Sequence, residues 1–159
     1  MEKIRVEVEI EDRKEVRLIE VEGRSLAGVL EGVRALAAEH GEGLHIFERD
    51  ADDVIGVEIE ARKAISVMGH RHKKLHVVIH FEHHTARHEF TPSSTVQKVL
   101  TWAVERKEFG LDPTAKAKAN LILPHGTEPL PRDEMIGRYV AHPHHEVTFN
   151  LTLKDFTNG

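Results

Sequence analysis

The sequence predicts an α+β protein in which two similar small domains follow one another, and two observations support this fold class. Short runs along the 159-residue chain alternate apolar and polar residues, as strands with one solvated face do. The order strand, turn, strand, helix and then two or three strands occurs twice, offset by about 70 residues. Because crossover connections are right-handed, the last strand of each unit lies parallel to and beside its first strand, with the helix across the apolar face. This arrangement is a β-grasp.

In the first half, residues 4–11 alternate strictly and predict a strand with a solvated face formed by Arg5, Glu7, Glu9 and Glu11. A tight turn at 12–14 separates this strand from a second one at 16–21. A helix follows, for which Ser25 is a suitable N-cap and Gly41 a suitable end. Two more strands complete the unit, at 44–47 and 62–68.

The second half repeats this order. A strand at 75–81, a turn at 82–85 and a strand at 86–90 form the predicted hairpin. Ser94 and Gln97 have the spacing of a capping box, ahead of an apolar helical stripe from Val96 to Val104. Gly110, Asp112 and Pro113 are expected to end this helix, and strands follow at 120–123 and 146–153, with a turn and short strand between them. We place the domains at 1–69 and 74–159, joined by a linker at 70–73.

Composition excludes several classes of function. A net charge of −5 gives no basic footprint for nucleic acid, and no run of apolar residues is long enough to span a membrane or act as a signal peptide. The absence of cysteine excludes disulfides and thiolate nucleophiles. We find no phosphate-binding loop, nucleophile elbow or zinc-protease motif. We therefore expect a cytoplasmic protein that is not an enzyme.

With this order of elements established, the second half resembles ubiquitin. The segment GTEPLPRDEMIGRYV (Gly126–Val140) has the layout of that family's turn, short strand and following loop, and an alternating last strand and an extended tail come after it. Two such domains in one chain that ends in glycine resemble the interferon-induced tandem ubiquitin-like modifier. They resemble more closely its bacterial counterparts, which are encoded in antiphage defence operons beside activating, conjugating and deconjugating enzymes.

The resemblance implies a reaction at the C-terminus. The carboxylate of Gly159 would be adenylated with ATP by a separate activating enzyme, carried as a thioester on a cysteine conjugating enzyme, and joined to an amine of a target protein, viral proteins being among the candidate targets. A deconjugating protease would reverse the attachment. The protein itself would bind no cofactor. Phe156, Thr157 and Asn158 would be the tail residues that the activating enzyme recognises, since Phe156 is a large apolar group in a polar tail.

The sequence departs from the family in two ways. Asn158 stands where the family usually has the first of two glycines. The apolar patch that most ubiquitin readers bind corresponds here to Leu123, Thr148 and Asn150, of which only Leu123 is apolar. Recognition by ordinary ubiquitin-binding domains is therefore not expected.

Trp102 and the thirteen histidines are the other features that could mark a site. Trp102 could anchor a partner or pack against the first domain, and we favour packing because tandem domains need an apolar seam. Two histidine groups, His76, His80, His83, His84 and His88, and His142, His144 and His145, could bind a divalent metal. We favour solvated strand faces and predict no metal site, because no cysteine or closely spaced carboxylate completes a ligand set. Two alternative functions remain: a non-covalent binding module, metal-responsive through these histidines, and a sulfur carrier.

Overall fold

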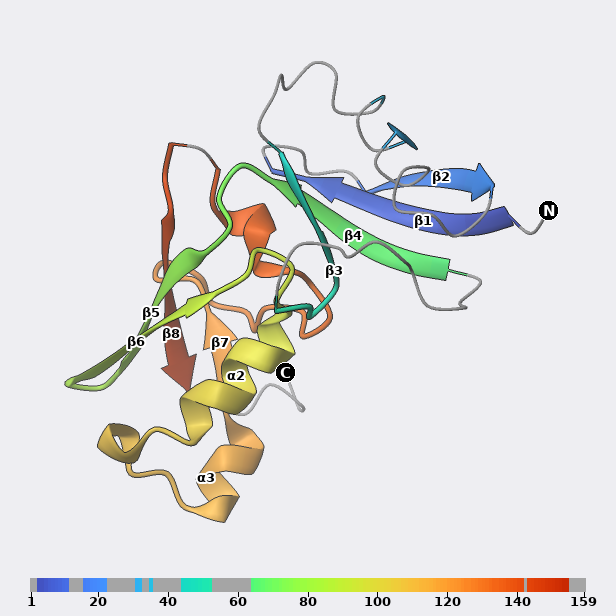
Figure 1. Ribbon diagram of the computed structural model, residues 1–159. Helices are drawn as coiled ribbons and strands as arrows, with labels where there is room; N and C mark the ends of the chain where they lie inside the picture. The colour runs from blue at the N-terminus through green and yellow to red at the C-terminus, as the bar shows by residue number, and fades with distance from the viewer. Residues whose placement is uncertain are drawn as a thin grey trace.

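In a computed structural model the chain forms two four-stranded mixed sheets, one from each half (Figure 1). The structure describes residues 3–11, 16–22, 31–32, 35, 44–52, 64–141 and 143–154. The first sheet has the order β2-β1-β4-β3 and the second the order β6-β5-β8-β7. In each, the first strand pairs antiparallel with the second and parallel with the last. The predicted pair of β-grasp units is therefore confirmed.

The first sheet consists of β1 (Lys3–Ile10), β2 (Arg17–Glu22), β3 (His45–Glu48) and β4 (Ala64–His70). β4 continues two residues beyond its predicted end at Met68, because Gly69 pairs with both Ile10 and Ile46. Most of the predicted helix between Ser25 and Gly41 lies outside the described residues; positions 31, 32 and 35 are helical.

The second sheet consists of β5 (Leu75–Phe81), β6 (His84–Phe90), β7 (Asn120–Ile122) and β8 (Glu146–Thr152). Helix α2 (Val96–Val104) crosses one face of it. The alternation of β5 and the stripe of α2 meet in one core, in which Val77, Ile79, Val99 and Phe149 are fully buried. Burying each of these side chains stabilises the fold by about 1.5–3 kcal/mol.

The N-terminus of α2 differs from the predicted capping box. Thr95 is the N-cap, and its side chain accepts a hydrogen bond from the Lys98 backbone N–H. Ser94 is buried, and its hydroxyl hydrogen-bonds the Thr91 hydroxyl at 3.1 Å. The Gln97 amide donates to the Thr101 hydroxyl one turn later and does not reach back to the cap. Ser94 and Thr95 are both chemically able to act as the N-cap, so the residue that does so is decided by the segments packed beside them.

Three elements of the second half differ from their predicted form. Asp112 and Pro113 do not simply end a helix: Asp112 accepts a hydrogen bond from the Ala115 N–H and begins α3 (Pro113–Lys118). The β5–β6 turn is shorter than predicted and contains only residues 82 and 83, because Glu82 adopts a positive φ of 54°. The short strand expected near residue 130 does not form; Leu130 instead donates its backbone N–H to Leu121 C=O.

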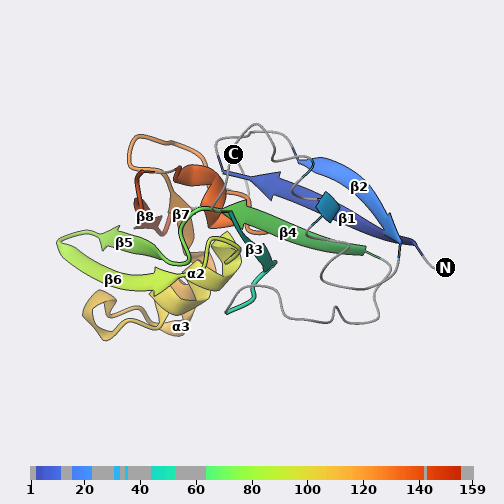
Figure 2. The ribbon, with the colours of Figure 1, turned by 45° about the horizontal axis from the view of Figure 1, so that its top comes forward.

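The solvated face predicted for β1 is only partly solvated. Arg5 and Glu7 are exposed, but Glu9 and Glu11 retain 4% and 0% of their accessible surface. The second domain covers this end of the sheet with the 3-10 helix η3 (Ile136–Tyr139), the orange-red coil beside β1 and β4 (Figure 2). A Cβ on Gly137 would lie 3.1 Å from Met68 Cε and 2.9 Å from Pro92 C=O, so the two domains approach closely here. We call this contact the domain seam.

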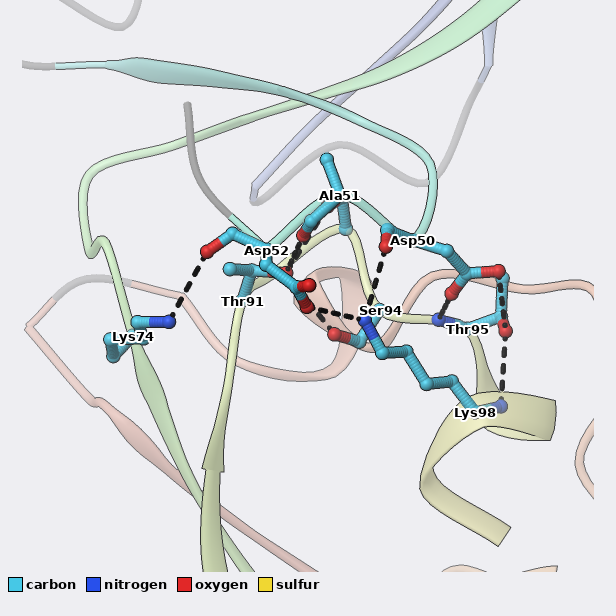
Figure 3. Close-up of polar contacts among 9 residues, drawn as sticks. Asp50, Ala51, Asp52, Lys74, Thr91, Ser94, Thr95 and Lys98 are labelled. Carbon is cyan, nitrogen blue, oxygen red and sulfur yellow. Dashed lines mark hydrogen bonds and ion pairs between the residues drawn. The ribbon is translucent and has the colours of Figure 1, made fainter. Parts of the chain in front are cut away.

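A loop of the first domain, residues 50–52, forms the other half of the domain seam at the N-terminus of α2 (Figure 3). The Asp50 carboxylate accepts from the Thr95 N–H at 2.7 Å and from the Thr95 hydroxyl at 3.2 Å. The Asp50 N–H donates to Ser93 C=O, and the Thr91 hydroxyl donates to Ala51 C=O at 2.7 Å. Negative charge is favourable at a helix N-terminus. Asp50 of the first domain therefore adds to the capping of α2 that Thr95 of the second domain provides.

We predict that Asp50→Gly lowers the free energy of unfolding by about 1–2 kcal/mol, because the Thr95 N–H loses its hydrogen bond to a charged carboxylate. Glycine adopts the positive φ of 60° at this position without strain, so the decrease in stability measures the contribution of the Asp50 carboxylate. Chemical denaturation measures it. Asp52→Ala is the matched control: Asp52 is exposed and pairs with Lys98 at 2.8 Å, and its removal should leave the unfolding midpoint near that of the wild type. Equal losses from both variants would contradict the cap.

Candidate functional site

The chain leaves the second domain from the centre of its sheet. β8 lies between β5 and β7, and Phe149 and Leu151 hold it in the core with 0% and 5% exposure. After Thr152 the strand ends, and Lys154, which is exposed, donates its backbone N–H to the Thr152 hydroxyl. The exit of the tail is therefore fixed by a buried strand. The predicted reactive and recognition residues, Phe156, Thr157, Asn158 and Gly159, lie beyond the described residues and remain predictions.

The described surface of the second domain carries few exposed large apolar side chains. Leu123 is 36% exposed, and the turn from Leu123 to Gly126, closed by a 2.8 Å hydrogen bond from Gly126 N–H to Leu123 C=O, holds it at the edge of β7. Thr148 and Asn150 are half-buried on β8. Leu123 is thus the exposed large apolar side chain that the described part of the second domain offers to a partner.

Trp102 packs on its own domain. His88 stacks on the indole ring with centroids 5.1 Å apart, and Phe90 meets it edge-on at 5.7 Å. The Arg106 guanidinium lies 4.4 Å from the ring centroid, within range of a cation–π contact. The packing of Trp102 against the first domain, which the sequence favoured, has no counterpart among the described residues, where the domain seam is built from other side chains. Trp102 remains half-buried, and a role in partner binding is still a prediction.

The first histidine group divides between two faces of the second sheet. His76 and His80 are exposed on the face away from α2, whereas His88 contacts Trp102 on the helix side. His145 joins His76 at a ring separation of 5.1 Å. Within the described residues, no group of three or more histidine or acidic side chains has the arrangement of a metal site, and His142 lies outside them.

His70, which the sequence placed in the linker, is the buried last residue of β4 and part of the domain seam. Its Nδ1 accepts from the His72 N–H, so the ring proton is on Nε2, which donates to Val140 C=O of the second domain at 2.6 Å. Glu11 lies 3.7 Å from the same Nε2 and accepts from the Arg71 N–H. Alternation alone could not identify this residue as buried, since the covering surface comes from 70 residues further along.

The domain seam also contains a charge network. Arg138 of η3 donates to the Glu9 carboxylate at 2.7 Å and pairs with Glu134, which accepts from the Tyr139 hydroxyl. Burial raises the pKa of Glu9, and Arg138 opposes that rise without overcoming it. Burial alone would lower the pKa of Arg138, but Glu9 and Glu134 outweigh it and the pKa is raised. Burial, followed by the hydrogen bond to Glu134, raises the pKa of Tyr139. Removing either charge of the Glu9–Arg138 pair would therefore leave the other charge at the domain seam without its ion-pair partner.

The sheet order, the crossing helix and the central exit strand define a ubiquitin-like β-grasp protein. Residues 76–154 match the family model of BilA ubiquitin-like domain 2, a match that covers just under half of the chain. The second half is therefore a ubiquitin-like domain similar to that of BilA, a kind of domain that enzymes act upon and that is not itself an enzyme. The comparison with the interferon-induced protein remains a prediction. Curated proteins gave no match. No helix in the described part of the chain is long and apolar enough to cross a membrane.

We predict that Arg138→Ala destabilises the protein by about 2–3 kcal/mol at pH 7. This is less than the roughly 3–5 kcal/mol for a fully buried pair, because Arg138 is partly exposed. The variant leaves the Glu9 carboxylate buried without its partner, which raises the pKa of Glu9 further. The folded state then binds the Glu9 proton more tightly than the unfolded state does, so the free energy of unfolding falls as pH rises above 4.5. The deficit of the variant should shrink on acidification.

Denaturant titrations between pH 4.5 and pH 8 check this sign. Adding Glu9→Gln to Arg138→Ala removes the titrating group and should remove most of the additional pH dependence. A deficit of Arg138→Ala that is constant across this range would show that its cost comes from lost packing.

We also predict that zinc and nickel bind only weakly and without defined stoichiometry, because His88 is directed away from His76 and His80. Isothermal titration calorimetry with each metal provides the measurement. A single tight site per chain would favour the metal-responsive alternative instead.

Proposed function

We propose that the protein is a ubiquitin-like modifier of a bacterial antiphage pathway, attached to amines of target proteins through the carboxylate of Gly159. The observation that carries the proposal is the match of residues 76–154 to a BilA ubiquitin-like domain. The position of β8 supports it, because a strand buried in the centre of the sheet leads directly to the exposed Lys154 and the tail that follows. Attachment to viral proteins would be the antiphage step.

Glycine suits an acyl donor at this position. Without a Cβ, its carbonyl carbon is open to attack, and the tail can enter a narrow enzyme channel. A free carboxylate is a poor electrophile, so ATP must first convert it to an acyl adenylate with release of pyrophosphate. An enzyme cysteine then displaces AMP to form a thioester, and a target amine displaces the thiol to form the amide.

The partners follow from this chemistry. The chain has no cysteine, so the thioester must form on separate enzymes, an ATP-dependent activating enzyme and a cysteine conjugating enzyme. A protease that cleaves the new amide would make the modification reversible. Phe156, Thr157 and Asn158 would be recognised by the activating enzyme, and Leu123 would be an apolar contact for a partner at the end of β7. The reactions would take place in the cytoplasm, where ATP is supplied.

Deleting Gly159 should abolish thioester formation without changing the melting temperature, because β8 and the core remain intact. The chain is incubated with ATP, the cognate activating enzyme and its conjugating partner, and thiol-sensitive adducts are separated on non-reducing gels. Gly159→Ala keeps the length of the tail and should react more slowly, since its Cβ crowds the carbonyl carbon. An adduct that survives the deletion would exclude the terminal carboxylate as the reactive group.

Residues 74–159 alone should not replace the full chain. This fragment lacks the Asp50 loop and the sheet face that covers η3, so we expect a lower melting temperature than that of the second domain within the intact protein. We also expect incomplete biological activity, because the first domain supplies a recognition surface. A fragment that matched the full chain in stability, thioester formation and antiphage protection would contradict this division of roles.

A further inference from the structure

Strand β6 has one edge to which no strand in the described part of the chain pairs. The second sheet has the order β6-β5-β8-β7, so β6 binds only β5 within it. The His76 N–H of β5 points away from β6, because it donates to the C=O of His145, the residue before β8. Glu89, the β6 residue opposite His76, therefore directs its own N–H and C=O away from β5.

The alternation of the ladder extends this arrangement to every second residue of β6. The backbone groups of Thr85 and Arg87, like those of Glu89, point outward. No backbone hydrogen bond joins these outward groups to another described residue. A hollow of about 430 Å³ lies along the strand and is lined in part by Arg87, His88 and Glu89. The β5–β6 hairpin projects away from the first sheet in Figures 1 and 2, so this edge is open to a further strand.

The charges on β6 favour one particular strand as its partner. Arg87 and Glu89 are exposed and carry opposite charges on the same face of the sheet. Among the ion pairs of the described residues none involves Arg87, whereas Glu89 lies 3.6 Å from His76 Nδ1. An edge with charges of one sign repels a second copy of itself. Here, two antiparallel copies of β6 related by a twofold axis at His88 place Arg87 of each copy opposite Glu89 of the other.

This register also satisfies the backbone. Arg87 and Glu89 both direct their N–H and C=O outward, so the two residues form a pair that exchanges both of its backbone hydrogen bonds, and the symmetry repeats the pair. A register shifted by one residue would bring outward groups against residues whose backbone groups bind β5. A twofold axis at Arg87 would place two arginines opposite each other. Only the register centred on His88 joins outward backbone groups and opposite charges together.

We propose that the protein forms a symmetric dimer in which the β6 edges of two copies pair antiparallel about His88 and join the second domains in one continuous sheet. Opposite charges directly across a sheet stabilise such pairing. Trp102, which stacks on His88, then lies beside the twofold axis. Because β5 separates β6 from β8, the pairing does not use the strand that leads to the tail. The inference is independent of the proposed function, since it concerns β6 alone.

Analytical ultracentrifugation of the full chain tests the dimer. Because the interface is small and polar, we expect a dissociation constant on the order of 10–100 μM. Arg87→Glu and Glu89→Arg should each weaken the dimer about tenfold or more, since each places like charges opposite one another twice. An equal mixture of these two variants, and a chain that carries both substitutions, should each dimerise like the wild type, because opposite charges again face each other. Lys118→Glu, the same change of charge at an exposed residue of α3, is the matched control and should leave the affinity unchanged.

Trp102 is the single tryptophan of the chain, so its fluorescence emission gives a second measurement and should change over the concentration range in which the dimer forms. A wild-type chain that remains a monomer at concentrations well above the expected dissociation constant would overturn the inference. A dimer of unchanged affinity in Arg87→Glu and Glu89→Arg would also overturn it, as would a mixture of these variants that fails to dimerise although circular dichroism shows both to be folded.

Discussion

The contact between the Asp50 carboxylate and the N-terminus of α2 is the constraint on which the arrangement of the molecule depends. An α-helix begins with backbone N–H groups that have no partner within the helix, and here one of the groups at this end is satisfied by a residue of the other domain. Because Asp50 also donates its own backbone N–H to Ser93 C=O, both the backbone and the side chain of this residue bind the second domain. The helix of one domain is thus completed by the other.

This contact also determines which part of each sheet is accessible. With the Asp50 loop on α2, η3 lies on the outer face of the first sheet, and Met68, Glu9 and His70 become interior residues. A sheet face that would otherwise present apolar side chains to partners is used within the chain. The corresponding face of the second sheet carries polar residues such as Thr148 and Asn150. Among the described residues, the exposed large apolar side chains are therefore Val16 and Leu18 of the first domain and Leu123 of the second.

The buried charges of the domain seam favour a specific arrangement more than they add stability. Glu9 is buried at a cost that Arg138 offsets only in part, as its raised pKa shows. The hydrogen bond from His70 to Val140 requires one tautomer of a neutral imidazole. Groups of this kind tolerate few alternative packings, so a sliding or rotated arrangement of the two domains would leave a buried charge without its partner.

The local sequence pattern predicted both β-grasp units. The alternation of residues 75–81 and the apolar stripe of α2 indicate directly which side chains lie in the core of their own domain. The sequence also indicated that, of Leu123, Thr148 and Asn150, only Leu123 is apolar. Only the tertiary structure decided that Glu9, Glu11 and His70 are buried, that Thr95 and not Ser94 caps α2, and that Trp102 packs on its own domain. The physical reason is that these features depend on which surface of a second domain covers a residue, and the periodicity of a single strand or helix carries no record of that partner.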